Sequence, residues 1–103
     1  MERTRLSVDA ATDLAEVMQG LASPTRVMIV ARLREGAVGV TALADDLGLS
    51  QATVSNHLRV LRHAKLVEGT RDGRTIVYSL FDEHVTEFID QAMSHLSHTH
   101  VSD

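Results

Sequence analysis

Apolar residues recur at the spacing of an α-helix in five stretches of the chain, separated by glycine, serine and proline positions. These stretches cover residues 9–20, 23–36, 41–47, 51–64 and 82–98. Ser23, Ser50 and Asp82 are each placed to cap the start of a helix, and Pro24 suits a first helical position. Gly48 is placed to end one, because glycine tolerates the left-handed conformation of a helix C-terminus. The pattern therefore predicts five helices.

A different pattern separates the fourth and fifth helices. Residues 66–71 and 74–80 resemble two strands on either side of Asp72-Gly73, and an Asp-Gly pair is a strong signal for a two-residue hairpin turn. The expected element order is therefore ααααββα. This is a mainly α fold with one β-hairpin, in a single domain over residues 1–103.

Length and composition favour a second copy of the chain as a partner. The chain has 103 residues, of which 44% are hydrophobic but only 3% aromatic, so its own core is small. Pairing of two copies would bury additional apolar area, and a homodimer is expected. No apolar run approaches the roughly 20 residues of a membrane span. A cytoplasmic protein without a membrane segment or cleavable leader is expected.

The charge is unevenly distributed along the chain. The formal net charge is −4, which by itself argues against a nucleic-acid partner. Residues 51–80, however, contain five basic side chains against two acidic ones, whereas residues 81–103 contain five acidic side chains and neither lysine nor arginine. The middle of the chain therefore has the charge expected of a DNA-binding surface.

The third and fourth helices, joined by Gly48-Leu49-Ser50, suit a helix-turn-helix in which the fourth helix, about 51–64, enters the major groove of double-stranded DNA. With the hairpin over about 66–80 as a wing, this predicts a winged helix-turn-helix. Polar side chains around the start and outer face of the fourth helix, and two arginines near the hairpin tip, are the candidate DNA contacts. They are Ser50, Gln51, Thr53, Ser55, Asn56, His57, Arg59, Arg71 and Arg74. The alternative is a helical hairpin whose arginines are merely solvated.

Histidines gather behind Asp82 in the last quarter of the chain. They are His84, His95, His98 and His100. Residues eleven apart on one helix, such as His84 and His95, point within about 20° of each other but lie about 16 Å apart along the axis. They could share a metal only across two antiparallel copies of the helix, with a two-fold axis near Ile89 and Asp90. Asp82 and His84 of one chain would then face His95 and His98 of the other, giving two sites per dimer.

An apolar seam is expected between the two copies of this last helix, with the histidines along its edge. It consists of Val85, Phe88, Ile89, Ala92 and Leu96. The alternative is that the histidines are surface residues near a helix C-terminus, where a positive charge is favourable.

The chain has no cysteine, which excludes disulfides and thiolate metal sites.

Three segments closely resemble the ArsR/SmtB family of bacterial metal-responsive repressors. They are residues 21–26 (LASPTR), residues 47–61 (LGLSQATVSNHLRVL) and Asp72-Gly73-Arg74, within a likeness that covers roughly residues 11–100. The resemblance implies a homodimer whose terminal helices form the interface, and which binds a palindromic operator and typically releases it when metal binds. It also implies a site between the two last helices.

The pattern of Asp82, His84, His95 and His98 followed by His100 looks like the nickel- and cobalt-sensing branch of that family. The resemblance therefore favours nickel or cobalt over zinc. Imidazole suits all three metals, so ligand type leaves the choice open. The segment before Ala10 has no histidine, whereas sensors of this branch can recruit one there, so the source of a fifth and sixth ligand also stays open.

Two other functions fit parts of the pattern. A DNA-binding regulator controlled by a partner protein, or not metal-responsive on its own, would leave the histidines without a role. A metallohydrolase could use histidine and aspartate to activate water, but no nucleophile arrangement or phosphate-binding loop accompanies them. The leading prediction is a metal-responsive DNA-binding regulator, and these two functions remain its alternatives.

Overall fold

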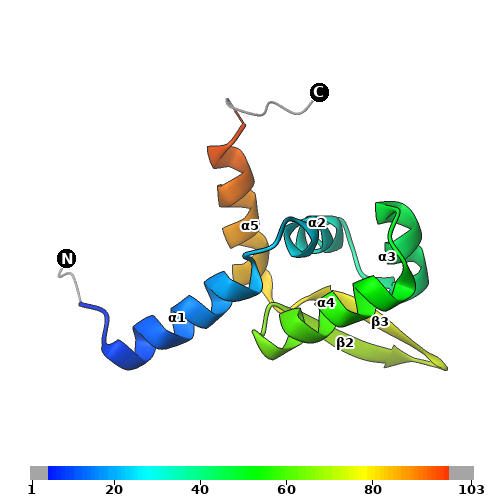
Figure 1. Cartoon of the computed structure of the whole chain (residues 1–103), viewed down its shortest axis with the longest axis horizontal. Coiled ribbons are helices and arrows are strands. Elements are labelled where there is room, and N and C mark those ends of the chain that lie inside the picture. The colour runs from blue at the N-terminus through cyan, green and yellow to red at the C-terminus, as the bar shows by residue number, and fades with distance from the viewer. Residues whose placement is uncertain (1–4, 98–103) are drawn as a thin grey trace.

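The computed structural model describes residues 5–97 (Figure 1), and within them the predicted element order is confirmed with one additional short strand. The elements are α1 (Val8–Gly20), α2 (Pro24–Leu33), β1 (Val38–Gly39), α3 (Val40–Leu47), α4 (Gln51–His63), β2 (Val67–Asp72), β3 (Thr75–Leu80) and α5 (Glu83–His95). The fold is a winged helix-turn-helix. The last helix ends at His95, before the predicted end at residue 98, and His98 itself lies outside the described residues.

Helix starts follow the predicted caps. The hydroxyls of Ser23 and Ser50 and the carboxylate of Asp82 accept hydrogen bonds from backbone N–H groups three residues later. Pro24 occupies the first turn of α2, where its missing N–H costs no intrahelical bond. Ser7 caps α1 in the same way. Local side-chain chemistry therefore sets where these helices begin.

The core lies between α2, α3, α4 and the base of the hairpin. The predicted stripe of α4, Val54, Leu58 and Leu61, is buried to within 1% of complete. It packs in one cluster with Ile29, Val30, Leu33, Leu43, Ala44, Leu66, Val67, Leu80, Val85 and Ile89. The helix α4, the predicted recognition helix, is thus held on one side by the core, and its other side faces outward.

The sheet differs from the prediction in two respects. Its order is β1-β3-β2, and β1, which was not predicted, pairs antiparallel with β3 through Val38 and Gly39. The hairpin register pairs Asp72 with Thr75, so Gly73 and Arg74 form the two-residue turn, not Asp72 and Gly73. Gly73 has a positive φ of 66° and Arg74 does not. A turn of the Asp-Gly type needs positive φ at both central residues, whereas a Gly-X turn needs it only at the first.

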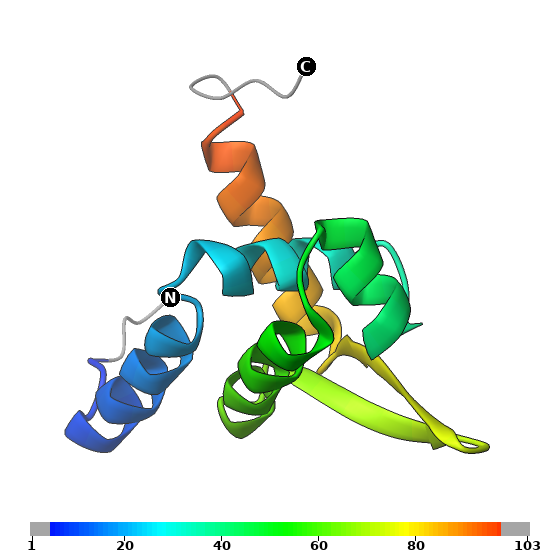
Figure 2. The same cartoon turned by 45° about the vertical axis from the view of Figure 1, so that its right-hand side comes forward.

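The helices at the two ends extend away from this body, as Figures 1 and 2 show for α1 and the C-terminal part of α5. On α1 only Gly20 is buried, and Leu14 and Met18 remain 45% exposed. The predicted seam on α5 is divided between two sides of the helix. Val85 and Ile89 pack into the core of their own chain, whereas Phe88 is 41% exposed.

Candidate nucleic-acid interface and metal-binding helix

The turn between α3 and α4 orients the recognition helix. Gly48 ends α3 with a φ of 68°, and the N–H of Leu49 then reaches back to the carbonyl of Ala44 at 2.9 Å. Such a left-handed residue reverses the chain within three residues and leaves Ser50 free to cap α4. The local sequence therefore forms the turn between the two helices.

Exposed polar residues of α4 form the face opposite its buried stripe. Gln51, Ser55, Asn56 and Arg59 are all exposed. A guanidinium nitrogen of Arg59 donates to the side-chain oxygen of Asn56 at 3.2 Å, so these two side chains are held together one turn apart. Amide and guanidinium groups are the side chains that read adenine and guanine edges in the major groove.

Three of the predicted contacts have other partners within the chain. Ser50 Oγ donates to Thr53 Oγ1 at 2.9 Å and accepts from the Thr53 N–H at 3.1 Å, so both hydroxyls belong to the helix cap. His57 is half-buried, and its Nδ1 lies 3.3 Å from Nη1 of Arg26 on α2. Their contacts with DNA stay predictions.

The hairpin and α4 border an open groove of about 520 Å³. Ser55 of α4 and Arg74 at the hairpin turn both line it, and Arg71 is exposed on the same hairpin. Thr41 and Tyr78 also line the groove but were not predicted. Their contribution depends on the approach of α3 to β3, which no local pattern reveals.

The predicted metal ligands on α5 are only partly brought together. Nδ1 of His84 lies 3.5 Å from Oδ2 of Asp82, and the His84 side chain is 90% exposed. The other carboxylate oxygen of Asp82 accepts the capping N–H of Val85. His95 is exposed at the far end of the same helix. His98 and His100 lie outside the described residues.

Residues 5–97 of a single chain contain no group of three or more His, Asp or Glu side chains able to hold one metal ion. His84, Phe88 and His95 nevertheless share one side of α5, since spacings of four and seven residues bring side chains to similar directions. That side carries imidazoles on either side of an exposed aromatic ring.

Within residues 5–97, no helix has the length and apolar character needed to cross a membrane.

Comparisons with known proteins agree with this architecture. A helix-turn-helix domain family matches residues 21–70. The transcriptional regulator NmtR of Mycobacterium tuberculosis is 48% identical over 96 residues, covering 93% of this chain and 80% of NmtR. The solution structure of apo-NmtR superposes with a TM-score of 0.77 at 45% identity, covering 99% of this chain and 86% of that one.

A second relative, the transcriptional repressor SmtB of Mycobacterium tuberculosis, is 40% identical over 80 residues, covering 78% of this chain and 59% of SmtB. All these relatives are transcriptional regulators, which excludes the metallohydrolase alternative. The chain belongs to the ArsR/SmtB family of DNA-binding winged helix-turn-helix transcriptional regulators, within its NmtR-like branch.

Proposed function

We propose that the protein is a homodimeric cytoplasmic repressor that binds a palindromic operator and changes its operator affinity when a divalent metal binds between two α5 helices. The observation that carries the proposal is the side of α5 where His84 and His95 border the exposed Phe88. In a chain 48% identical to NmtR, an exposed apolar face flanked by imidazoles suits both a second copy and a metal.

In the DNA complex, the exposed face of α4 reads bases and the hairpin contacts the backbone. Asn56 and Arg59 have the side chains for major-groove readout, and Ser55 lies where α4 meets the hairpin groove. Arg71 and Arg74 contribute positive charge toward phosphates. Gln51 lies at the N-terminal end of α4, where recognition helices approach base edges.

The DNA proposal is tested on a duplex selected from a random pool by the wild-type protein. We expect Asn56→Ala to relax the preference at one base position. We expect Arg74→Ala to weaken selected and unrelated duplexes alike and to reduce the salt slope by about 1. Arg5→Ala is the matched control, because it removes the same charge from an exposed residue before α1, outside the helix-turn-helix and the hairpin. Unchanged affinity and selectivity in both test variants would contradict this interface.

The ligand set must come from two chains. Asp82 and His84 of one protomer would hold the metal with His95 and His98 of the second, and His100 would supply a further ligand. Carboxylate and imidazole donors suit nickel, cobalt and zinc, and a fifth or sixth donor favours nickel or cobalt. The bound metal supplies positive charge and directional bonds that hold the two α5 helices at one separation.

Metal binding is tested by counting nickel, cobalt and zinc ions per purified dimer after equilibrium dialysis. We expect two ions per dimer for the wild type and none for His84→Ala or His95→Ala. Mixed dimers of these two variants should recover one ion, because one of their two sites keeps both histidines. His63→Ala, on α4, should keep two.

Metal should also change the affinity for the selected duplex by about 5- to 150-fold, the usual range of allosteric coupling. Loss of ions in the single variants without recovery in the mixed dimer would contradict a shared site. Full binding with no effect on DNA affinity would contradict metal control and favour regulation by other means.

A further inference from the structure

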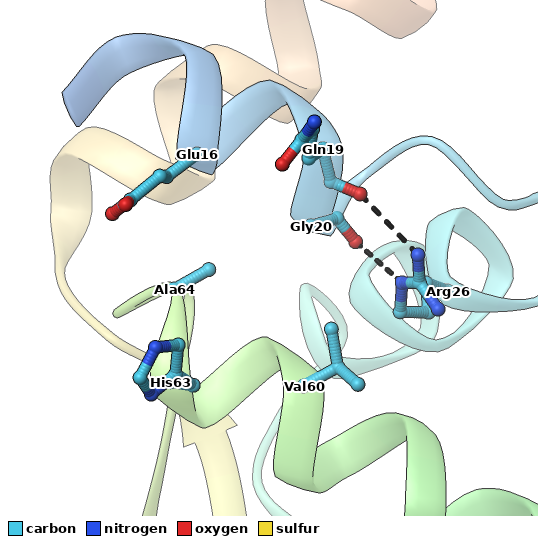
Figure 3. A pocket seen from close by; sticks show the side chains of 7 residues that line it. All are labelled: Glu16, Gln19, Gly20, Arg26, Val60, His63 and Ala64. Atoms are coloured by element: carbon cyan, nitrogen blue, oxygen red, sulfur yellow. Dashed lines mark hydrogen bonds between the residues drawn. The ribbon is translucent and has the colours of Figure 1, made fainter. Parts of the chain in front are cut away.

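One side chain, that of Arg26 in the first turn of α2, links three helices. Its Nε donates to the carbonyl of Gly20 at 2.7 Å and its Nη2 to the carbonyl of Gln19 at 3.3 Å, both at the end of α1 (Figure 3). Its Nη1 lies 3.3 Å from Nδ1 of His57 on the recognition helix. A single guanidinium therefore joins α1 to α4.

The remaining attachment of α1 to the body is slight. Along α1 only Gly20 is buried, and Val17 is half-buried against the core. Next to Arg26, an open pocket of about 400 Å³ separates Glu16 of α1 from Val60 and His63 of α4 (Figure 3). The direction of α1 is therefore determined near its C-terminal end.

The electrostatics of that end suit an arginine. The last carbonyls of a helix lack intrahelical partners and carry partial negative charge. The last turn of α1 has no basic residue of its own, so Arg26 supplies the cation from α2. Its planar guanidinium satisfies several acceptors at once and holds them in a defined geometry.

The contact with His57 has a defined hydrogen-bond direction. Arginine has only donors, so Nδ1 of His57 is the acceptor in this contact. His57 is half-buried beside the stripe that holds α4 on the core. The guanidinium of Arg26 therefore contacts both the end of α1 and a half-buried side chain of α4.

We propose that Arg26 is a positioning residue that holds α1 at a defined angle to α4 and thereby sets the separation of the two recognition helices in the dimer. The inference rests on the proposed function, because α1 would meet the second copy through its exposed Leu14 and Met18. A dimer with a defined separation binds best to half-sites of one spacing. Loss of Arg26 should therefore broaden the tolerated spacing.

The test measures affinity for the selected palindrome, for versions with one base pair added to or removed from its centre, and for an isolated half-site. We expect the wild type to lose at least tenfold in affinity when the spacing changes. We expect Arg26→Gln to bind all three spacings within about threefold of one another and to bind the half-site within twofold of wild type. A residue that merely keeps α4 folded would lower half-site affinity as well.

A second pair of variants isolates the link to α4 without disturbing the α1 end. His57 is also a predicted DNA contact, so each His57 variant is judged by the ratio of its affinities for the three spacings, whatever its half-site affinity. His57→Asn keeps an acceptor near the position of Nδ1 and should keep the wild-type ratio. His57→Leu removes the acceptor and should bring the three affinities as close together as Arg26→Gln does, and the double variant should bring them no closer.

Retention of the tenfold spacing preference in both Arg26→Gln and His57→Leu would overturn the inference. An equal loss of affinity for the half-site and the palindrome in Arg26→Gln would also overturn it. Sedimentation equilibrium is run on the wild type and on every variant to establish that each is a dimer. A monomeric wild type without spacing preference would contradict the proposed dimer on a palindromic operator, and the inference about Arg26 with it.

Discussion

Two residues with left-handed backbone conformations end the helices of the DNA-reading unit. Gly48 follows α3 with a φ of 68°, and Lys65 follows α4 with a φ of 60°. At both ends the next N–H bonds a carbonyl five residues back: Leu49 to Ala44, and Leu66 to Leu61, each at 2.9 Å. The geometry is the same, but only one position has the residue that adopts it without steric cost.

Lys65→Gly should therefore stabilise the protein. The left-handed conformation costs a residue with a Cβ about 1–2 kcal/mol, partly offset by the greater chain entropy of glycine in the unfolded state. We expect a net gain of about 0.5–1 kcal/mol, or several degrees in Tm for a domain of this size. Thermal unfolding at one protein concentration measures it.

Lys65→Ala is the matched control, because it removes the charge but keeps the steric cost. It should change the free energy of unfolding by no more than a few tenths of a kcal/mol, which corresponds to about one or two degrees in Tm. A gain in Lys65→Ala equal to that in Lys65→Gly would assign the effect to charge and contradict the backbone explanation.

At the scale of elements, α1 is held by a close backbone approach. A methyl group added at Gly20 would lie 2.9 Å from Cβ of Ala64 and 3.1 Å from Cδ1 of Leu66. The sequence pattern indicates Gly20 only as the end of a helix, yet the structure gives it a second role, as the contact point between α1 and the end of α4. That role depends on residues more than forty positions away.

Gly20→Ala should loosen α1. Overpacking of a tight site costs about 1–3 kcal/mol, which exceeds the gain of up to about 1 kcal/mol from higher helix propensity. We expect a lower Tm and faster amide hydrogen exchange in α1 than in α4. The double variant Gly20→Ala/Ala64→Gly lacks the opposing methyl. Its Tm and the hydrogen-exchange rate of α1 should return toward those of Ala64→Gly alone. Failure of that rescue would place the cause elsewhere.

At the scale of the whole molecule, exposed apolar residues concentrate on the two helices that extend from the body. Leu14, Met18, Phe88, Met93 and Leu96 are each between 41% and 49% exposed. Complete burial of such a side chain from full exposure is worth about 1.5–3 kcal/mol, so covering the exposed remainder is worth roughly 1 kcal/mol each. Association of two copies through α1 and α5 would therefore release substantial free energy.

Phe88→Asp should convert the dimer to a monomer without unfolding it, because the ring is only partly buried in its own chain. We expect the dimer dissociation constant to rise at least tenfold and Tm to become independent of protein concentration. Ile76→Thr is the control, since Ile76 is 40% exposed on the hairpin. Equal sedimentation behaviour of Phe88→Asp and wild type would contradict an α5 interface.

Features that depend on neighbouring residues were predictable from the amino-acid sequence. Ser23, Ser50 and Asp82 predicted three helix starts, and the spacing of Val54, Leu58 and Leu61 predicted the buried side of α4. These predictions hold because caps and helical periodicity act within a few residues. The winged helix-turn-helix was predictable for the same reason, whereas the family was predicted from the resemblance of three short segments.

Features that join distant segments became visible only in the folded chain. The two-residue strand β1 has no periodicity of its own and exists because β3 pairs with it. The division of the α5 seam, with Ile89 inward and Phe88 outward, depends on where the core meets that helix. Arg26 becomes a link between α1 and His57 for the same reason. Contacts between residues far apart along the chain follow from packing, which local patterns do not specify.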